Sequence, residues 1–430
     1  MIEKKSLFEA FEADIVRLYK TPEDIERVKK IFEKAESQSK RKEIPKPETK
    51  PNRLKKFVIH WKIRFKYGIH WRKKFFLFRV MRNYGLSFLY RLFHKNRHVF
   101  RGIEFDLTFK CNMKCHHCLC AKLDESDQKK ELEPDEYERV VKEAMKLGAH
   151  TFGLEGGEPF MAKNWEAILQ RMKPFTNHII ISSNGLMLDE KLVKKCAESG
   201  VDTINLSLDS GIPELHDVFR RRKGSFEKVK TAIALCKKYK IKVMLNTCLH
   251  KGNIYTEGLL RLLELAEREK LLVNILFAKG VGAFREKDSM LSDEDIQSFL
   301  KIAEPYNYWH IHHMGKLKSN HGGEGCSGSK EFVNITPYGD VINCANNHIY
   351  IGNVRNESFA AIRERALREL PFGKYRPCFL TMDQDFMNIY YPLLEKKNWI
   401  SCEEFHAALR DYEKKNNRII YPEISPKQEK

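Results

Sequence analysis

The stretch "IEFDLTFKCNMKCHHCLC" runs from Ile103 to Cys120 and joins a strand-like run to a loop rich in thiols. Its first seven residues, 103–109, have the largely apolar character of a buried strand. Four of the chain's eleven cysteines then follow within ten residues. Three of them have the spacing C-x3-C-x2-C, and we call them the loop cysteines: Cys111, Cys115 and Cys118. Such a loop can fold three thiolates around one centre.

The number of thiolates in this loop limits which metal centre it can hold. Three cysteines suit a cubane iron–sulfur cluster and leave one iron without a protein ligand. Structural zinc usually takes four protein ligands, and no paired C-x2-C lies elsewhere in the chain to complete such a site. The alternative is that these thiols are incidental or simply buried.

Strand-like runs recur downstream of the loop, and helical patterns lie between them. The strand-like runs cover residues 103–109, 150–157, 178–185, 203–209, 242–250 and 272–278, and the helical patterns cover 134–147, 164–172, 189–199, 225–239 and 256–269. Six βα units in order predict an α/β fold with a parallel sheet and helices outside it. We predict a partial (β/α)6 TIM-type barrel, with its chemistry on loops at the C-terminal ends of the strands.

Composition divides the chain into segments. We predict a helical N-terminal segment, a linker rich in Lys and Pro, a basic aromatic amphipathic segment, the barrel, a small C-terminal α+β domain and a tail, at residues 1–36, 37–53, 54–100, 101–320, 321–410 and 411–430. Thr21-Pro22-Glu23-Asp24 has the pattern of a helix start. In the C-terminal domain, "FVNITPYGDVINC" predicts a β-hairpin that turns at residues 337–340.

The motif "CNMKCHHC" after one strand and "GGEP" after the next resembles the radical S-adenosylmethionine (radical SAM) superfamily over about residues 103–320. The resemblance implies a 4Fe–4S cluster on the loop cysteines, with S-adenosylmethionine chelating the open iron through its amino and carboxylate groups. It also implies reductive cleavage to a 5′-deoxyadenosyl radical that takes a hydrogen atom from a substrate. The reductant would be a flavodoxin- or ferredoxin-like donor. One departure is His117, which stands where relatives often carry an aromatic residue near the adenine.

Polar residues at other strand ends are candidates for contacts with S-adenosylmethionine. The glycines of the GGEP segment let the backbone approach a ligand closely, and its carboxylate can accept hydrogen bonds from an ammonium group. The resemblance adds polar groups after the third and fourth strands, and one arginine from the run at residues 220–222. The predicted cofactor contacts are Gly156, Gly157, Glu158, Pro159, Ser183, Asn184, Ser207, Asp209 and Arg221. A solvated basic face is the alternative for the arginines.

The C-terminal domain carries a second set of cysteines. The spacing around Cys326 and Cys344 resembles the SPASM or the shorter twitch extension of radical enzymes, which bind auxiliary iron–sulfur clusters. A later C-x2-C-x5-C group is absent, which favours one auxiliary cluster over two. We predict Cys326, Cys344 and Cys378 as its ligands, with either Cys402 or an open iron in the fourth position. Buried or zinc-bound cysteines are the alternative.

The basic aromatic segment holds much of the chain's excess charge. The formal net charge is +19, and residues 51–100 contain fourteen Lys and Arg but no Asp or Glu. "FFLFRVMRNYGLSFLYRLF" (75–93) includes three arginines, so it suits a helix lying in the interface of an anionic membrane better than a helix spanning it. Nucleic acid is the rival partner, and a helical layer packed on the barrel is the third alternative.

The sequence favours an enzyme but leaves its substrate open. The N-terminus has no apolar signal segment and no apolar run reaches membrane-spanning length, so we expect a cytoplasmic protein. The basic segment adds the option of a peripheral position on the inner face of the membrane. The first hypothesis is a radical enzyme acting on a lipid or lipid-linked substrate. The second is a radical maturase of a ribosomally made peptide or protein. A non-catalytic iron–sulfur scaffold and a nucleic-acid modifying enzyme are the further alternatives.

Overall fold

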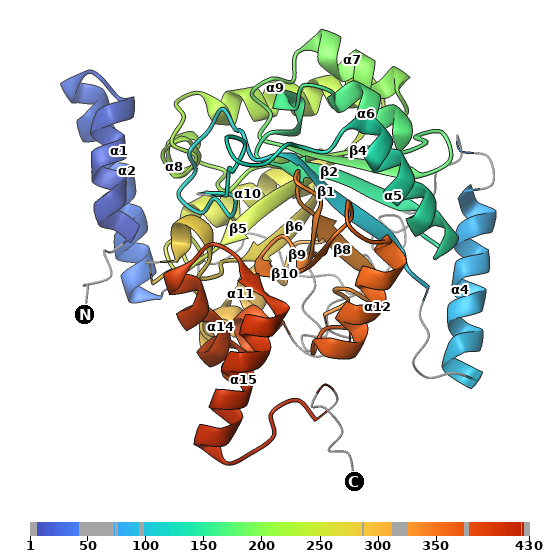
Figure 1. The fold of residues 1–430 in the computed structure, drawn as a ribbon. Coiled ribbons are helices and arrows are strands. Elements are labelled where there is room, and N and C mark those ends of the chain that lie inside the picture. The colour runs from blue at the N-terminus through green and yellow to red at the C-terminus, as the bar shows by residue number, and fades with distance from the viewer. Residues whose placement is uncertain are drawn as a thin grey trace. The chain divides into compact units, whose positions relative to one another are not determined.

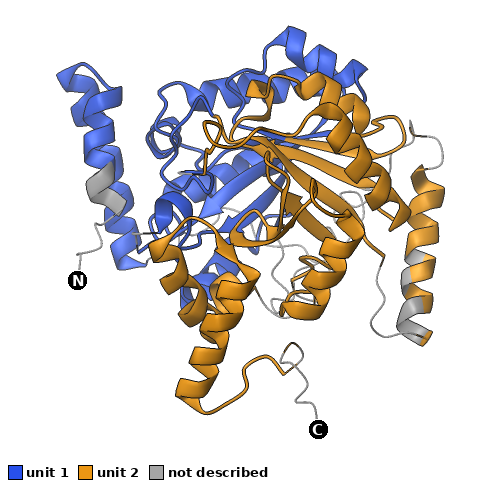
Figure 2. Cartoon of the chain, viewed as in Figure 1, with its two compact units in different colours: residues 1–69, 111–121, 182–312 blue, residues 70–110, 122–181, 313–430 orange. Residues whose placement is uncertain are grey.

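The computed structural model describes residues 7–42, 73, 76–93, 99–121, 123–285, 288–311, 326–373, 378–422 and 424. The chain forms two compact units (Figure 2), each built from separate stretches of sequence. Unit 1 contains residues 1–69, 111–121 and 182–312, and unit 2 contains residues 70–110, 122–181 and 313–430.

Unit 2 is built on a mixed sheet. Its strands are β1 (Gly102–Thr108), β2 (Thr151–Gly156), β3 (His178–Ser183, whose last two residues fall in unit 1), β8 (Phe332–Ile335), β9 (Asp340–Cys344), β10 (Asn347–Asn353) and β11 (Ile400–Ser401). They lie in the order β11-β10-β9-β8-β1-β2-β3. The pairs around β1 are parallel, whereas β8, β9 and β10 are antiparallel.

The helices of unit 2 accompany this sheet. They are α4 (Phe76–Phe93), α5 (Pro134–Lys146), η1 (Pro159–Met161), α6 (Trp165–Arg171), α12 (Phe359–Glu369), α13 (Phe379–Met382), α14 (Gln384–Lys396) and α15 (Cys402–Asn416). Helix α5 begins with a capping box between Glu133 and Glu136 and a proline at its first position. Its Tyr137 ring lies edge-on to Phe105 of β1, with ring centroids 5.2 Å apart. The odd-numbered residues of β1 therefore face the core under α5, and the even-numbered ones face the other side of the sheet.

Unit 1 carries a parallel sheet. Its strands lie in the order β4 (Thr203–Ser207), β5 (Lys242–Leu249), β6 (Leu272–Phe277) and β7 (Trp309–Ile311). Its helices are α1 (Leu7–Leu18), α2 (Pro22–Arg41), α7 (Glu190–Glu198), α8 (Pro213–Phe219), α9 (Ser225–Lys238), α10 (Glu257–Glu269), η2 (Gly282–Phe284) and α11 (Asp293–Ala303). Helices α1 and α2 lie side by side (Figure 1), and the rings of Phe11 and Phe32 are 5.1 Å apart.

The fold class predicted from the sequence is confirmed: the fold is α/β with a partial barrel of the TIM type and a small C-terminal domain. The six predicted strands correspond to β1–β6, and the predicted hairpin is β8–β9, with Gly339 in its turn at φ +91°. Strand β7 was not predicted. The predicted domain boundaries stay predictions, although α15 continues to Asn416, six residues into the predicted tail at 411–430.

The basic segment at residues 54–100 lies partly outside the described residues, which here are 73, 76–93 and 99–100. The described part contains α4, which coincides with the helix predicted at residues 75–93 except for the first residue. In the described part of the chain, no helix combines the length and apolar character needed to cross a bilayer.

Candidate functional site

The loop cysteines lie in a segment that unit 1 holds through its backbone, and all three are partly exposed. The Cys118 N–H donates to the carbonyl of Cys115 at 3.3 Å, which closes a tight turn. The His116 N–H donates to the Phe219 carbonyl at 3.1 Å, and the Ala283 N–H donates to the Cys118 carbonyl at 2.9 Å. The loop is therefore fixed by α8 on one side and by η2 on the other.

Two polar side chains are directed at sulfur atoms of this loop. Arg220 Nη1 lies 3.7 Å from Cys115 Sγ, and Asn184 Nδ2 lies 3.8 Å from Cys111 Sγ. Arg220 is only 7% exposed, and its Nε donates to Asp209 Oδ2 at 2.6 Å. Donors of this kind stabilise anionic sulfur and tune the potential of a cluster bound through it.

The thiols of the loop are close enough to influence one another electrostatically. Burial is the main cause that raises the pKa of Cys115 to about 12; Cys118 and Cys111 raise it further, whereas Arg220 lowers it. The pKa of Cys118 is lowered to about 7, chiefly by a hydrogen bond with Cys120. Cys120 is thus a neighbour of the loop cysteines that hydrogen-bonds to Cys118.

The three thiols of the loop match the ligand set of a cubane cluster. In a cubane each thiolate binds a different iron, so the three sulfurs stay farther apart than the ligands of one ion. Three thiols within electrostatic reach, two of them contacted by N–H donors, match that arrangement.

The GGEP segment lies against the strand end that leads into the cysteine loop. Gly156 has φ +116°, and the N–H groups of Gly157 and Glu158 donate to the carbonyls of Thr108 and Lys110 at 2.7 and 3.0 Å. A Cβ on Gly157 would lie 2.3 Å from the Lys110 carbonyl oxygen. Pro159 then opens η1, and the Glu158 side chain is fully buried as the cap of that turn.

This close approach predicts the effect of a single methyl group. We expect Gly157→Ala to destabilise the protein by about 1–3 kcal/mol, because the backbone on both sides must move apart. Chemical denaturation of the apo-protein measures that change. Gly85→Ala is the control, since a Cβ at Gly85 of α4 meets nothing within 4 Å and alanine favours a helix by up to about 1 kcal/mol. Equal stability of the two variants would contradict the prediction.

The other predicted cofactor contacts lie at different distances from the cysteine loop. Asn184 contacts it directly, through Cys111 and through Asn112 Oδ1 at 2.7 Å. Asp209 reaches it through Arg220. Ser183 accepts a hydrogen bond from the Gly185 N–H at 3.1 Å, and Ser207 is the last residue of β4.

The arginine run at 220–222 separates into two positions. Arg221, which the sequence analysis selected, has φ +56° and places its Nε 2.9 Å from Asp14 Oδ2 of α1. Arg220 is the member that contacts the loop. Although burial alone would lower it, Asp209 and Cys115 raise the pKa of Arg220 above its ordinary value, so the guanidinium stays charged.

His117 takes part in a stack of rings beside the loop. Its ring lies parallel to Phe219 with centroids 4.7 Å apart, and Phe219 stacks on His250 at 4.8 Å. Burial lowers the pKa of His117 well below its usual range, so the imidazole is neutral. A neutral stacked imidazole presents the flat ring that an aromatic residue would present at this position.

Cys326 and Cys344 lie on segments that approach one another in unit 2. Cys344 ends β9, and Cys378 directly precedes α13. Gly328, two residues after Cys326, lies so close to Asn343 that a Cβ there would be 2.0 Å from the Asn343 amide oxygen. Gly373 packs against the same segment, since its Cβ would lie 3.5 Å from the Gly328 carbonyl oxygen.

Cys402 differs from the other C-terminal cysteines. It is 7% exposed, and its thiol donates to the carbonyl of Tyr350 at 3.5 Å. Burial raises its pKa to about 12. A thiol engaged in this way is a weaker candidate for a metal ligand than the partly exposed Cys326, Cys344 and Cys378.

Family comparisons match the chain in two places. The radical SAM superfamily model matches residues 106–263, and the SPASM model, an iron–sulfur cluster-binding domain, matches residues 326–388. The chain therefore carries a radical SAM domain and a SPASM domain. The two matches contain the loop cysteines, the GGEP segment and three of the four C-terminal cysteines.

Two of the curated relatives come from Methanosarcina barkeri. The chain described here is 27% identical over 293 residues to an AdoMet-dependent heme synthase, covering 62% of this chain and 82% of that protein. It is 30% identical over 206 residues to an Fe-coproporphyrin III synthase, covering 47% of this chain and only 50% of that protein.

Solved structures of the radical SAM protein SuiB from Streptococcus suis share the fold. The complex with S-adenosylmethionine gives a TM-score of 0.51 at 16% identity, covering 72% of this chain and 76% of SuiB. The complex with the precursor peptide SuiA gives a TM-score of 0.51 at 14% identity, covering 83% of this chain and 81% of SuiB. The cofactors of a radical SAM enzyme with a SPASM domain are a 4Fe–4S cluster, S-adenosylmethionine and auxiliary iron–sulfur.

Sequence reasoning missed a group of acids on the sheet of unit 2. Glu104 and Asp106 lie on the face of β1 opposite α5, and Glu155 pairs with Asp106 across β1 and β2. Burial, followed by the charge of Glu155, raises the pKa values of Glu104 and Asp106 well above the ordinary range. The sequence feature that could have revealed these acids is the spacing of two residues between Glu104 and Asp106 in "IEFDLTF". That spacing places both acids on one face of a strand that was interpreted as continuously apolar.

Proposed function

We propose that this radical SAM enzyme abstracts a hydrogen atom from a substrate held at an anionic membrane surface. The enzyme class rests on the family matches. The cysteine loop supports the chemistry, because both contacts from Arg220 and Asn184 are directed at thiol sulfurs that would carry the cluster. When bound, the reduced cluster supplies the electron that cleaves S-adenosylmethionine; a flavodoxin- or ferredoxin-like protein is the expected donor.

Each part of the site has a proposed task. Cys111, Cys115 and Cys118 would hold the cluster, while Arg220 offsets the negative charge that collects on Cys115. The GGEP backbone and Glu158 would accept hydrogen bonds from the ammonium group of S-adenosylmethionine. In the SPASM domain, Cys326, Cys344 and Cys378 would hold one auxiliary cluster.

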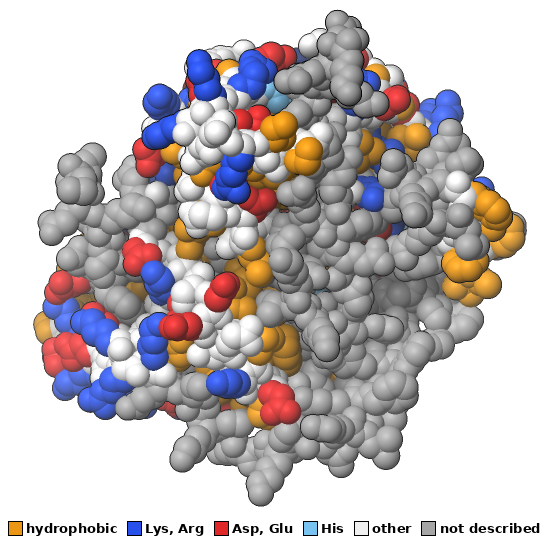
Figure 3. Space-filling model, turned by 90° about the horizontal axis from the view of Figure 1, so that it is seen from below, with side chains coloured by type: hydrophobic (Ala, Val, Ile, Leu, Met, Phe, Trp, Pro, Cys, Tyr) orange, Lys and Arg blue, Asp and Glu red, His pale blue; other side chains and the backbone are white. Residues whose placement is uncertain are grey.

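Helix α4 supports the membrane part of the proposal. Six of the large apolar side chains described in this helix are 43–74% exposed: Leu77, Phe78, Met81, Phe88, Leu89 and Phe93. In Figure 3 hydrophobic side chains gather at the right-hand edge of the molecule, where α4 lies in Figure 1. Soluble proteins rarely expose so many large apolar side chains on one helix unless the surface binds a membrane or a partner.

The inner side of α4 is fixed to unit 2. Phe76 is buried and stacks on His150 with centroids 5.8 Å apart. Arg79 donates to Asn177 Oδ1 at 2.8 Å and to the Ala149 carbonyl at 2.7 Å. Arg79 therefore faces the protein, whereas the exposed Arg82 lies among the exposed apolar side chains of α4. That surface favours a bilayer over nucleic acid, and the acid-free sequence around it suits anionic headgroups.

Vesicle flotation tests the membrane assignment. We expect the full chain to float with vesicles of phosphatidylserine and phosphatidylcholine, and the triple variant Phe78→Ser, Met81→Ser, Phe88→Ser to lose about tenfold or more in partitioning, because each exposed side chain contributes apolar burial worth about 1.5–3 kcal/mol at most. The control carries Phe175→Ser and Ile419→Ser, which are exposed by 60% and 64% elsewhere. Undiminished flotation of the triple variant, or salt-sensitive RNA binding without flotation, would overturn this assignment.

A second candidate is maturation of a ribosomally made peptide. It is supported by the shared fold with SuiB, whose structure is described as a complex with a precursor peptide, and by the acids Glu104, Asp106 and Glu155, which suit cationic or neutral groups better than carboxylates. Anaerobic assays with phospholipid vesicles, Lys-rich peptides and Fe-coproporphyrin III separate the candidates. The true substrate class raises 5′-deoxyadenosine formation above the substrate-free rate, and no rise with vesicles would remove the lipid hypothesis.

A further inference from the structure

Helices α1 and α2 form a hairpin that lies outside both matched family regions yet packs into unit 1. The hairpin and the rest of unit 1 share one buried apolar cluster. The hairpin contributes Phe11 and Ile15 of α1, Tyr19 of the connection, and Val28 and Phe32 of α2; the rest of unit 1 contributes Val218, Phe219, Cys248, Ala278 and Phe284. The Ser39 hydroxyl donates to the Lys251 carbonyl at 2.7 Å, and Lys34 pairs with Glu257 at 2.7 Å. The hairpin is therefore docked along its whole length.

One carboxylate of this hairpin gathers three basic side chains. Asp14 of α1 is only 2% exposed. Its Oδ2 lies 2.7 Å from His116 Nε2 and 2.9 Å from Arg221 Nε, and its Oδ1 lies 2.7 Å from Arg17 Nη2. Burial opposes ionisation of this carboxyl, but Arg17, His116 and Arg221 hold its pKa below the ordinary value. Asp14 is therefore a buried anion with three partners.

One of those partners follows Cys115 in the chain, and another follows the arginine that contacts the Cys115 sulfur. His116 follows Cys115 directly in the cysteine loop, and Phe11 packs edge-on against its ring at 4.9 Å. Arg221 follows Arg220, whose guanidinium contacts Cys115 Sγ. Asp14 thus holds His116, the residue after Cys115, and Arg221, the residue after Arg220.

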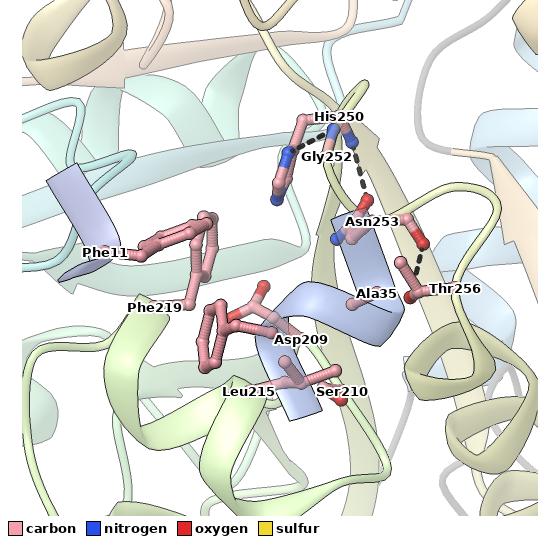
Figure 4. Close-up of a pocket in the computed structure, with 11 residues that line it drawn as sticks. Phe11, Ala35, Asp209, Ser210, Leu215, Phe219, His250, Gly252, Asn253 and Thr256 are labelled. Atoms are coloured by element: carbon pink, nitrogen blue, oxygen red, sulfur yellow. Dashed lines mark hydrogen bonds between the residues drawn. The ribbon is translucent and has the colours of Figure 1, made fainter. Parts of the chain in front are cut away.

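A small, partly open pocket lies between the hairpin and other residues of unit 1 (Figure 4), lined on the hairpin side by Phe11, Phe32 and Ala35. Phe219 lines the same pocket, and its carbonyl holds the His116 N–H. Phe219 therefore belongs both to the apolar cluster that holds the hairpin and to the backbone contact that holds the cysteine loop.

We propose that the α1–α2 hairpin is a clamp on the cysteine loop and that Asp14 is its positioning residue. The clamp holds His116 and Arg221 so that Cys115 and Arg220 keep their alignment. This inference rests on the proposed cluster site for its functional meaning, but the clamp itself is a property of the apo-protein. Asp14→Asn keeps the size of the side chain and removes the charge that three buried or half-buried bases share.

Hydrogen exchange of the apo-protein tests the clamp without any cofactor. We expect amides of residues 111–121 to exchange at least about tenfold faster in Asp14→Asn, since the buried carboxylate that lies 2.7 Å from His116 Nε2 of this loop loses its charge. Glu12→Gln is the matched control: Glu12 lies on the same helix, and its contact with Lys29 is on the surface. Exchange in Asp14→Asn equal to that in Glu12→Gln would overturn the proposal, whatever the enzyme is found to do.

The reconstituted protein gives a second readout. Iron transfer to a ferrous chelator should be about tenfold faster in Asp14→Asn, and the electron paramagnetic resonance spectrum of the reduced cluster should broaden, because Cys115 samples more positions. If Asp14→Asn instead releases the whole hairpin, seen as fast exchange throughout α1, His116→Asn probes the same contact from the loop. The double variant should then be no faster than the worse single variant; additive rates would show that Asp14 and His116 act independently and would overturn the clamp.

Discussion

Cys115→Ala abolishes formation of 5′-deoxyadenosine from S-adenosylmethionine, with an expected loss of at least about 10³-fold under dithionite. Among the loop cysteines, we choose Cys115 because its sulfur is contacted by the buried Arg220 guanidinium, so the substitution removes a ligand and this contact together. Without that thiolate the loop retains two cysteine ligands, and among the described residues Arg220 keeps only Asp209 as an anionic partner. Iron should fall from about eight to about four per chain if two cubane clusters are present.

Controls distinguish loss of one cluster from general instability. Cys236→Ala removes a fully buried thiol on α9, so we expect a stability cost of about 1–2 kcal/mol with iron and activity retained. Cys344→Ala should also lose about four irons but keep cleavage of S-adenosylmethionine, because it lies in the SPASM region. Undiminished 5′-deoxyadenosine from Cys115→Ala with full iron content would refute the assignment of the loop.

The local motifs of this chain could be predicted from sequence because each is complete within a few residues. The C-x3-C-x2-C loop, the GGEP turn and the hairpin at Gly339 depend on spacing and on glycine at defined positions. Gly157 illustrates this, because its contact with Lys110 leaves no space for a side chain. Such local constraints can be recognised directly in the amino-acid sequence.

The choice between Arg220 and Arg221 could not be made from sequence. Helix α8 ends at Phe219, Arg220 keeps a right-handed helical backbone, and Arg221 turns left-handed at φ +56°. That change of backbone sends two adjacent identical side chains to different partners, Asp209 and Asp14. No pattern in "RRR" records where the helix ends.

Long-range docking was equally hidden. Asp14 and His116 are about a hundred residues apart in the chain, and Asp14 and Arg221 are farther apart still. The amphipathic pattern of α1 and α2 indicates only that one face is buried, and not what covers it. The same applies to α4, where the sequence suggested cations free to meet headgroups, whereas Arg79 is bonded to unit 2.

The Asp209–Arg220 pair predicts the largest change in stability. Asp209→Ala leaves the Arg220 guanidinium buried without its anion, and breaking a buried pair from one side costs about 3–5 kcal/mol. The same substitution removes the acceptor of the Cys248 N–H, which Asp209 Oδ1 holds at 2.9 Å. Denaturant unfolding of the apo-protein measures the loss. Asp24→Ala, at a surface pair with Arg27, should cost less than about 1 kcal/mol.

Removing both charges separates the cost of an orphaned cation from the worth of the pair. The double variant Asp209→Leu, Arg220→Met fills similar volume without charge, so we expect it to recover most of the stability lost in Asp209→Ala. It should nevertheless fail to support cleavage of S-adenosylmethionine, since no cation would remain beside Cys115. A double variant less stable than Asp209→Ala would mean that the pair is held for folding itself. Recovery of stability without activity would mean instead that the buried arginine is kept for the sulfur it contacts.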